Sequence, residues 1–192
     1  MGFICIIIGY IIGSLSGAII LSKLKNLPDP RETGSGNAGA TNMLRTAGLN
    51  NAAMVMGVDI AKGLVAIIIG RIFGISAGAL SLVALATVAG HIFPVSFKFK
   101  GGKGVATMLG CLIGLAPMTG ILCIIIWVAV LYLTNYASLA SIISTCSAVV
   151  LTFLFGNQTY SFALLVIAFL VVWSHKKNIE RLMNGTESKV NL

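Results

Sequence analysis

The sequence predicts an all-α integral membrane protein with about seven transmembrane helices, some of them short or half-spanning. Three observations support this fold class. Of the 192 residues, 57% are hydrophobic and 9% are charged, whereas soluble domains carry about 25% charged residues. The mean hydropathy is +1.00. Most charged residues gather in three short segments, and the apolar runs between them suit spanning helices, which need roughly 20 residues. This composition excludes an ordinary water-soluble protein and a disordered chain. We expect one integral membrane domain over residues 1–192.

The three charged segments set the expected orientation. They are residues 23–45, residues 98–103 and the tail from His175. Because Lys and Arg collect in cytoplasmic loops, we place all three on the cytoplasmic side, which requires an even number of spans between each pair. No positively charged stretch precedes the apolar residues 3–22, so we expect an uncleaved first span there rather than a signal peptide. The N-terminus is then outside and the C-terminus inside.

The remaining apolar runs fill this topology. The six further expected helices are 52–70, 77–95, 105–115, 118–134, 138–155 and 159–174. The helix at 105–115 is short, so we expect it to cross only part of the bilayer or to line a protein cavity. The alternative is six helices, with 105–134 as one kinked helix. The number of spans between the second and third charged segments would then be odd, and the two could not lie on the same side. The last residues, about 184–192, are expected to form a frayed polar tail.

The net charge of +8 does not indicate a nucleic-acid partner. The basic residues are few and clustered, and no aromatic stacking platform lies among them. We expect the positive charge to set the topology and to bind an anionic substrate. The four cysteines lie in apolar runs without CxxC spacing, so we expect them to be buried and to form neither a metal site nor a disulfide framework. They are Cys5, Cys111, Cys123 and Cys146.

A glycine-rich segment at residues 34–42 is the first candidate site. Its glycines allow positive φ and bring backbone N–H groups close to a ligand, where successive N–H groups can form an anion-binding nest. A helix beginning between Asn37 and Thr41 would add a favourable dipole. The segment is not a Walker loop, because the G-K-[ST] ending is missing. A flexible cytoplasmic turn is the alternative. The candidate phosphate-binding residues are Ser35, Gly36, Asn37, Thr41, Asn42 and Arg45.

A second glycine-rich turn and a basic tail segment give the other candidates. Gly101, Gly102 and Gly104 surround Lys103, a point cation at the mouth of a helix. His91 closes an apolar span shortly before this turn and is a candidate catalytic residue, although a lone interfacial His is usually structural. In the tail, His175, Asn178 and Arg181 share one helix face at i, i+3 and i+6. A basic membrane anchor is the alternative for this segment.

One pair of charges lies inside an expected span. Asp59 and Lys62 are three residues apart, and ionisable residues within a membrane are functional candidates by default. The alternative is a pair that only satisfies itself near the cytoplasmic third of the bilayer.

Together, the two loops and the basic tail favour a phosphate at the cytoplasmic interface and a lipid as the second substrate or product. Carboxylates are scarce, so we expect no metal and no cofactor. The sequence contains no G-x-S-x-G elbow, so it does not support a mechanism through a covalent acyl-enzyme. A transporter of a phosphorylated or anionic solute is the main alternative, but the last four expected spans are almost purely apolar at their middles.

Three runs resemble known motifs over essentially the whole chain. GSGNAGATN at 34–42, GHIFPVSFKFKGGKGVAT at 90–107 and HKKNIERL at 175–182 resemble the motif regions of the bacterial acyl-phosphate-dependent glycerol-3-phosphate acyltransferases, the PlsY family. The resemblance implies transfer of a fatty acyl group from acyl phosphate to the 1-hydroxyl of sn-glycerol 3-phosphate. The products are lysophosphatidic acid and phosphate, in the first acylation of bacterial phospholipid synthesis. It also implies a bacterial inner-membrane protein with its active site at the cytoplasmic face and no metal.

The residues suggest a mechanism for this reaction. Positioning two anions and stabilising developing charge would supply most of the catalysis. We expect one phosphate at the first loop and the other at the second loop near Lys103, His175 and Asn178, with the acyl tail in a groove open to lipid. Which phosphate each loop binds is left open. A substrate phosphate can itself take the hydroxyl proton, and His91 or His175 is the competing base.

Overall fold

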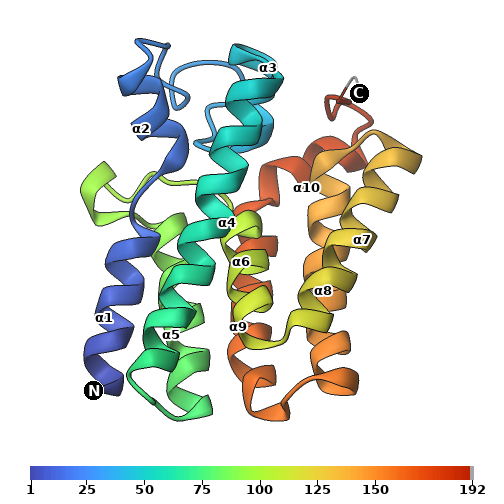
Figure 1. Cartoon of the computed structure of the whole chain (residues 1–192). Helices are drawn as coiled ribbons and strands as arrows, with labels where there is room; N and C mark the ends of the chain where they lie inside the picture. Colours follow the sequence, from blue (N-terminus) through green and yellow to red (C-terminus); the bar gives the residue numbers. More distant parts are fainter. Residues whose placement is uncertain (191–192) are drawn as a thin grey trace.

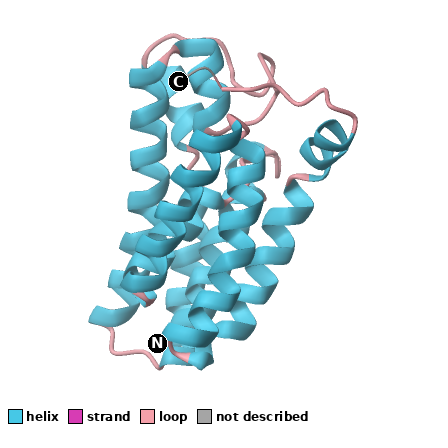
Figure 2. Cartoon of the chain, turned by 90° about the vertical axis from the view of Figure 1, so that its right-hand side faces the viewer, coloured by secondary structure: helices cyan, strands magenta, loops and turns pink. Residues whose placement is uncertain are grey.

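The computed structural model describes residues 1–190, and this part of the chain is helical (Figures 1 and 2). Its elements, in chain order, are α1 (Gly2–Gly13), α2 (Gly17–Leu24), α3 (Ala40–Ala47), α4 (Leu49–Ile72), α5 (Ala77–Ile92), η1 (Val95–Phe97), α6 (Val105–Leu115), α7 (Pro117–Thr134), α8 (Ala137–Phe155), η2 (Gln158–Tyr160), α9 (Ser161–Ser174) and α10 (Lys176–Met183).

These elements confirm the predicted all-helical membrane fold. Among the described residues, four segments are each long and apolar enough to cross a membrane: α4, α5 with η1, α7 and α8. Two bent pairs pass the same test together, namely α1 with α2 and η2–α9 with α10. The remaining apolar helix, α6, is short and has the predicted bounds of 105–115. It ends where Pro117 begins α7, because proline cannot continue the preceding helix's hydrogen bonding.

The first span is not the single helix predicted at 3–22. The chain bends by 46° between α1 and α2. The hydroxyl of Ser14 donates to the Tyr10 carbonyl at 2.8 Å, and the hydroxyl of Ser16 caps α2 by accepting from the Ile19 N–H at 3.4 Å. Ser and Thr side chains that bond to nearby backbone groups favour helix ends over helix interiors. The last span also bends, by 58°, before α10.

Glycines bring the helices of the core close together. A Cβ on Gly63 of α4 would overlap the Thr107 carbonyl of α6, and a Cβ on Gly110 of α6 would overlap the Ile60 carbonyl of α4. Small residues allow such close approach between membrane helices. In Figure 1, α6 consequently lies against α4, with α7 on its other side. Cys5, Cys111 and Cys123 are buried as expected, whereas Cys146 is exposed.

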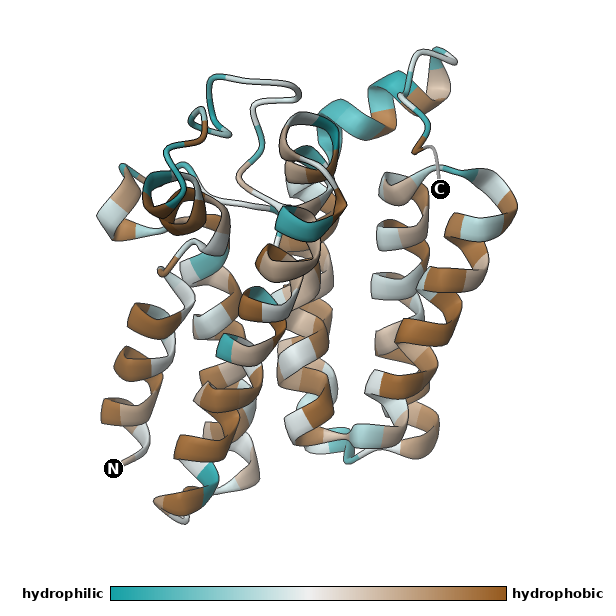
Figure 3. Ribbon diagram, turned by 45° about the horizontal axis from the view of Figure 1, so that its top comes forward, coloured by the Kyte–Doolittle hydropathy of each residue, from teal (hydrophilic) through white to brown (hydrophobic). Residues whose placement is uncertain are grey.

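The charged segments lie at one end of the bundle, as the parity argument requires. Figure 3 shows hydrophilic residues over the loops beside α2, α3 and α10 and hydrophobic residues over the membrane helices. The N-terminus lies at the opposite end from the C-terminal segment (Figures 1 and 2). The three segments can therefore form one surface on the same side of a membrane.

The expectation of a frayed tail is wrong for residues 184–190. Gly185 has φ +68° and turns the chain back over the bundle, a conformation that glycine adopts without steric cost. Glu187 and Val190 are 8% and 6% exposed, and the Val190 N–H donates to the Asn135 carbonyl at 2.8 Å. The tail is thus a packed strap across the turn between α7 and α8, while residues 191–192 lie outside the described part.

Candidate active site

A cavity opens at the charged end of the bundle and draws on all three charged segments. Its polar lining includes Ser35, Asn37, Thr41, Asn42, Arg45, His91, Lys103, Gly104, His175, Asn178 and Glu187. Its apolar lining includes Met56, Ile60, Val105, Ala106, Leu109, Ile124, Trp127 and Val128. Most of the predicted site residues are therefore brought together around one space. That space has a polar end at the loops and an apolar end among α4, α6 and α7.

Asn42 holds the first glycine-rich loop in shape. Its Oδ1 accepts a hydrogen bond from the Ser35 N–H at 2.8 Å. Its Nδ2 donates to the carbonyls of Pro30 and Thr33 at 2.8 and 3.0 Å. The side chain is 1% exposed. Because these bonds use its amide, Asn42 serves the loop's geometry, and Ser35, Asn37 and Thr41 remain as ligand candidates.

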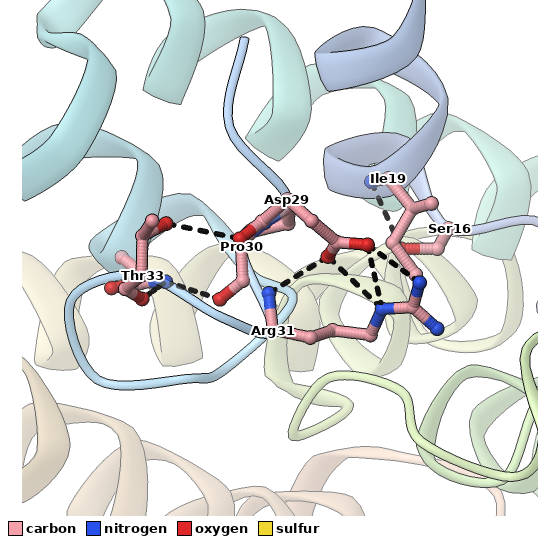
Figure 4. A network of polar contacts seen from close by, with 7 residues as sticks. Ser16, Ile19, Asp29, Pro30, Arg31 and Thr33 are labelled. Atoms are coloured by element: carbon pink, nitrogen blue, oxygen red, sulfur yellow. Dashed lines mark hydrogen bonds and ion pairs between the residues drawn. The ribbon is translucent and has the colours of Figure 1, made fainter.

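An ion pair between Asp29 and Arg31 lies just before this loop in the sequence (Figure 4). The Asp29 carboxylate accepts from the Arg31 backbone N–H at 2.9 Å and from the Arg31 guanidinium at 2.6 to 3.1 Å. These hydrogen bonds lower the pKa of Asp29. Arg31 faces a second, outer cavity that is lined by Gly36, Gly101 and two lysines. Of the glycines predicted to bind phosphate, Gly36 and Gly101 thus lie on the outer cavity, and Gly104 lies on the main one.

Two helix N-termini meet at the main cavity. Ala40 begins α3 after the first loop, and Val105 begins α6 after the second; both line the cavity. Gly104 precedes α6 with φ +89°, which favours glycine. The first N–H groups of a helix have no partner within it, so they and the helix dipole attract an anion. Each loop therefore presents a helix N-terminus to the same space.

A chain of hydrogen bonds joins the second loop to the C-terminal strap. The Lys103 ammonium donates to Asn178 Oδ1, and Asn178 Nδ2 donates to Glu187 Oε1 at 2.7 Å. The same carboxylate accepts from the Ser138 hydroxyl at 2.8 Å and from Arg181 Nε at 2.6 Å. Lys103 and Asn178 are thereby held together, as the predicted site requires.

The surroundings of Lys103 and Glu187 lower the pKa values of both side chains. Burial lowers the pKa of Lys103 to about 8, and Arg181 and Arg45 act in the same direction against the opposing effect of Glu187. Burial acts to raise the pKa of Glu187, but hydrogen bonds from Asn178, Ser138 and Arg181 outweigh it and lower the pKa. Glu187 is therefore ionised at neutral pH, and Lys103 carries its positive charge below about pH 8.

The two histidines occupy different environments. His175 is 2% exposed, and its Nδ1 lies 2.7 Å from the Val171 carbonyl. Because a carbonyl only accepts, Nδ1 carries the ring proton and Nε2 is left able to accept one. His91 is 5% exposed, and its Nδ1 is 2.7 Å from the Lys62 ammonium. An ammonium only donates, so Nδ1 of His91 is an acceptor committed to Lys62.

Several lining residues were absent from the sequence prediction. Glu187 was assigned to a frayed tail, and Ser138 and Trp127 were assigned to apolar spans. The Trp127 indole donates to the Ser141 hydroxyl at 3.1 Å, which fixes the ring at the cavity wall. The available signal for Glu187 was the glycine two residues before it, which permits the chain to turn back.

Two residues at the apolar end of the cavity are substantially exposed. Met56 of α4 and Val128 of α7 line the cavity and are 36% and 53% exposed. Among residues 1–190, no group of three His, Cys, Asp or Glu side chains is placed to hold a metal ion.

Comparisons with known sequences assign a family. Residues 3–185 match the family described as "Glycerol-3-phosphate acyltransferase". The chain is 50% identical over 189 residues to a glycerol-3-phosphate acyltransferase of Coxiella burnetii strain Dugway 5J108-111, covering 98% of each protein. It is 46% identical over 188 residues to one of Neisseria gonorrhoeae strain NCCP11945, covering 95% of this chain and 94% of the relative.

Solved structures agree with these sequence matches. A crystal structure of PlsY, an integral membrane glycerol 3-phosphate acyltransferase, in its glycerol 3-phosphate form has a TM-score of 0.94 and 37% identity, covering 99% of this chain and 96% of that chain. The lysophosphatidic acid form of the same enzyme has a TM-score of 0.91 and 36% identity, with coverages of 99% and 95%.

Proposed function

The chain belongs to the family of integral membrane glycerol-3-phosphate acyltransferases, and from this premise we propose that its acyl donor is an acyl phosphate. The protein is an enzyme that acylates glycerol 3-phosphate to lysophosphatidic acid, which replaces the transporter alternative. The proposal concerns the donor, the roles of the site residues and the side of the membrane on which they work.

The shape of the main cavity supports this donor. Its polar end carries two helix N-termini together with Arg45 and Lys103, and its apolar end includes the partly exposed side chains of Met56 and Val128. An acyl phosphate has the matching form, with an anionic head and a long apolar tail. A bulky nucleotide or a carrier protein is not required to explain any group in this cavity.

Two anion-binding elements suit two phosphates. We assign one phosphate to the α3 N-terminus with Ser35, Asn37, Thr41 and Arg45. The other belongs to the α6 N-terminus and Lys103, which Asn178 orients. Held in this way, the 1-hydroxyl oxygen of glycerol 3-phosphate attacks the acyl carbonyl carbon, and the bond from that carbon to the phosphate oxygen breaks. The helix N-termini and Lys103 stabilise the negative charge on the departing phosphate.

The hydroxyl proton has two possible carriers. It finishes on the released phosphate, which can take it directly from the hydroxyl. The alternative carrier within the protein is Nε2 of His175, whose Nδ1–H is held by the Val171 carbonyl. Substituting His175→Ala and His91→Ala separately decides between them: near-wild-type turnover in both variants excludes a protein base at these positions.

The expected location follows from the charges. The three charged segments carry most of the basic residues, so the end of the bundle at which they lie belongs in the cytoplasm. We propose a multi-pass protein of the bacterial inner membrane, with glycerol 3-phosphate reaching the cavity from the cytoplasm. In this proposal the lipid product leaves into the bilayer past Met56 and Val128.

Phosphate release from palmitoyl phosphate by the purified protein in detergent tests the donor. Release that requires glycerol 3-phosphate, with equimolar lysophosphatidic acid formed, supports the proposal. In Lys103→Ala we expect kcat/KM to fall by about 100- to 1,000-fold, the usual cost of removing one charge-stabilising group. Lys100→Ala is the matched control, because Lys100 is an exposed lysine that lines the outer cavity. Wild-type protein that releases no phosphate under these conditions would contradict the proposed donor.

A further inference from the structure

A buried group of three ionisable residues lies directly beneath the glycine-rich loops. The Lys62 ammonium is 2.8 Å from Asp59 Oδ1 and 2.7 Å from His91 Nδ1. It also donates to the Leu15 carbonyl at 2.6 Å. Asp59, Lys62 and His91 are 2%, 6% and 5% exposed. The hydrogen bonds of this ammonium go to the Leu15 carbonyl and to His91 Nδ1, and Asp59 is its ion-pair partner. The proposed chemistry assigns the ammonium no role.

This group, the Asp59–Lys62–His91 cluster, contacts the second glycine-rich loop through His91, next to the point where Gly102 of that loop approaches the first loop. The Gly102 N–H of the second loop donates to the His91 carbonyl at 3.1 Å. A Cβ on Gly102 would overlap Nε2 of the His91 ring and would lie 2.9 Å from the carbonyl of Ala38 in the first loop. The imidazole thus stands where the two loops meet, next to the residue that precedes Lys103.

The cluster also connects the helices that carry the loops. Leu15 lies at the bend between α1 and α2, Lys62 on α4, and His91 on the last turn of α5. Gly63, the neighbour of Lys62, lies against the backbone of α6 at Thr107, within the first turn after the second loop. A displacement of Lys62 would therefore reach the second loop by two routes, through His91 and through the start of α6.

Stability alone does not account for such a cluster. Taking ions out of water is costly, and apolar residues of similar volume often stabilise a protein as well as a buried ion pair does. What the ions add is fixed direction, because each bond must be made to a particular acceptor. We propose that the Asp59–Lys62–His91 cluster is a positioning device that sets the second loop, and with it Lys103, against the first loop. This inference rests on the proposed function of the loops as phosphate sites.

The test removes both charges together, so that neither ion is left unpaired. In Asp59→Asn/Lys62→Met we expect an intact fold, with a melting temperature in detergent within about 5 °C of the wild type. The KM that rises in Lys103→Ala identifies the substrate bound by the second loop. We expect that KM to rise about tenfold in the double variant, as for the loss of one charged hydrogen bond, and the other KM to stay within about twofold.

Arg71→Met is the matched control. Arg71 is a cation on the same helix that donates to a backbone carbonyl, that of Gly114, at 3.0 Å, and it lies at the opposite end of α4 from the loops. Its replacement should leave both KM values unchanged. KM does not depend on the fraction of folded enzyme, so a merely structural role for the cluster would lower the measured turnover without moving KM. Unchanged KM values in the double variant, or an equal rise in both, would overturn the proposal.

Two further measurements keep the result decisive. If the double variant does not fold, His91→Gln retains an acceptor for Lys62 but withdraws the ring from Gly102, and the same selective KM rise is expected. Binding of inorganic phosphate, measured by titration calorimetry, needs no acyl donor. A wild type that binds phosphate without using palmitoyl phosphate would contradict the donor alone. A variant with an unchanged phosphate Kd would then contradict the positioning role, since we expect about tenfold weaker binding.

Discussion

The two glycine-rich loops have similar compositions, and each leads into a helix N-terminus at the same cavity, yet they are held in different ways. The side-chain hydrogen bonds that shape the first loop are local. Asn42 bonds to residues 7 to 12 positions away, and Asp29 bonds to Arg31 two positions away. The second loop is fixed from a distance. Lys103 bonds to Asn178, which is 75 positions away, and its carbonyl lies 3.2 Å from the Ser174 hydroxyl.

The hydrogen bonds that shape the first loop are thus local, whereas those that hold the second loop are tertiary contacts. The first loop is expected to keep its shape as long as its own segment is intact. The second depends on α4, α5, α9 and the C-terminal strap, so changes far from it in sequence should reach Lys103. Substitutions in each loop can test this distinction, and we expect the largest loss of activity in the second loop and the smallest in the first.

Among substitutions that change the shape of a loop, Gly102→Ala should have the largest effect, because the new methyl group would overlap the His91 ring. Moving Lys103 by even about 1 Å is expected to lower kcat/KM about 100-fold. Steady-state kinetics with palmitoyl phosphate and glycerol 3-phosphate measure this. Gly57→Ala is the control, since a Cβ there meets nothing within 4 Å. Wild-type activity in Gly102→Ala would show that the second loop has room to adjust.

Asn42→Ala should have a smaller effect, confined to the first loop. It removes three hydrogen bonds that shape the loop, and leaving their partners unsatisfied should cost about 2 to 3 kcal/mol of unfolding free energy. We expect kcat/KM to fall by about 10- to 30-fold. Thermal unfolding in detergent and the same kinetic assay report the two effects. Asn51→Ala, whose residue lies outside the cavity, is the control, and equal losses in both variants would argue against the assigned role.

The pH dependence of kcat/KM should reflect the ionisation of Lys103 in the second loop. Because the pKa of Lys103 is lowered to about 8, its positive charge is present below that pH and is lost above it. We expect kcat/KM, which reports groups in the free enzyme, to be about tenfold lower at pH 9 than at pH 7. Lys103→Arg keeps its charge over this range and should abolish the fall, whereas Lys100→Ala should retain it. A wild-type profile that is flat to pH 10 would contradict the assignment.

Asp29→Asn should have the smallest effect. The Asp29 and Arg31 side chains are 27% and 29% exposed, so their ion pair contributes only about 0.5 to 1 kcal/mol. With Asn42 still in place, activity should change by less than about threefold. Assays at low and high salt measure the contribution of the charge pair. A tenfold loss would mean that the ion pair, rather than Asn42, holds the first loop.

The fold class, the seven apolar segments and the two loops could all be predicted from the sequence. Hydropathy and charge are local properties, and a membrane leaves few ways to satisfy the backbone, so composition alone restricts the architecture. The first loop was readable for the same reason, since Ser35, Asn37 and Arg45 lie within one short segment. The bend at Ser14–Ser16 was missed, because an apolar run does not reveal where a hydroxyl will cap a helix.

The assembly of the second half of the site depends on how the helices pack. Glu187 lies beyond the last span, yet the turn at Gly185 brings its carboxylate to Asn178 and the Ser138 hydroxyl. His91 was predicted as a catalytic group, and the packing of the helices places its Nδ1 2.7 Å from the Lys62 ammonium, a contact that the sequence did not indicate. Hydrogen bonds between residues tens of positions apart depend on how helices pack, and that packing leaves no periodic signal in the sequence. The residues suited to bind phosphate can therefore be recognised in the sequence. The hydrogen bonds that hold them in place form only when the helices pack together.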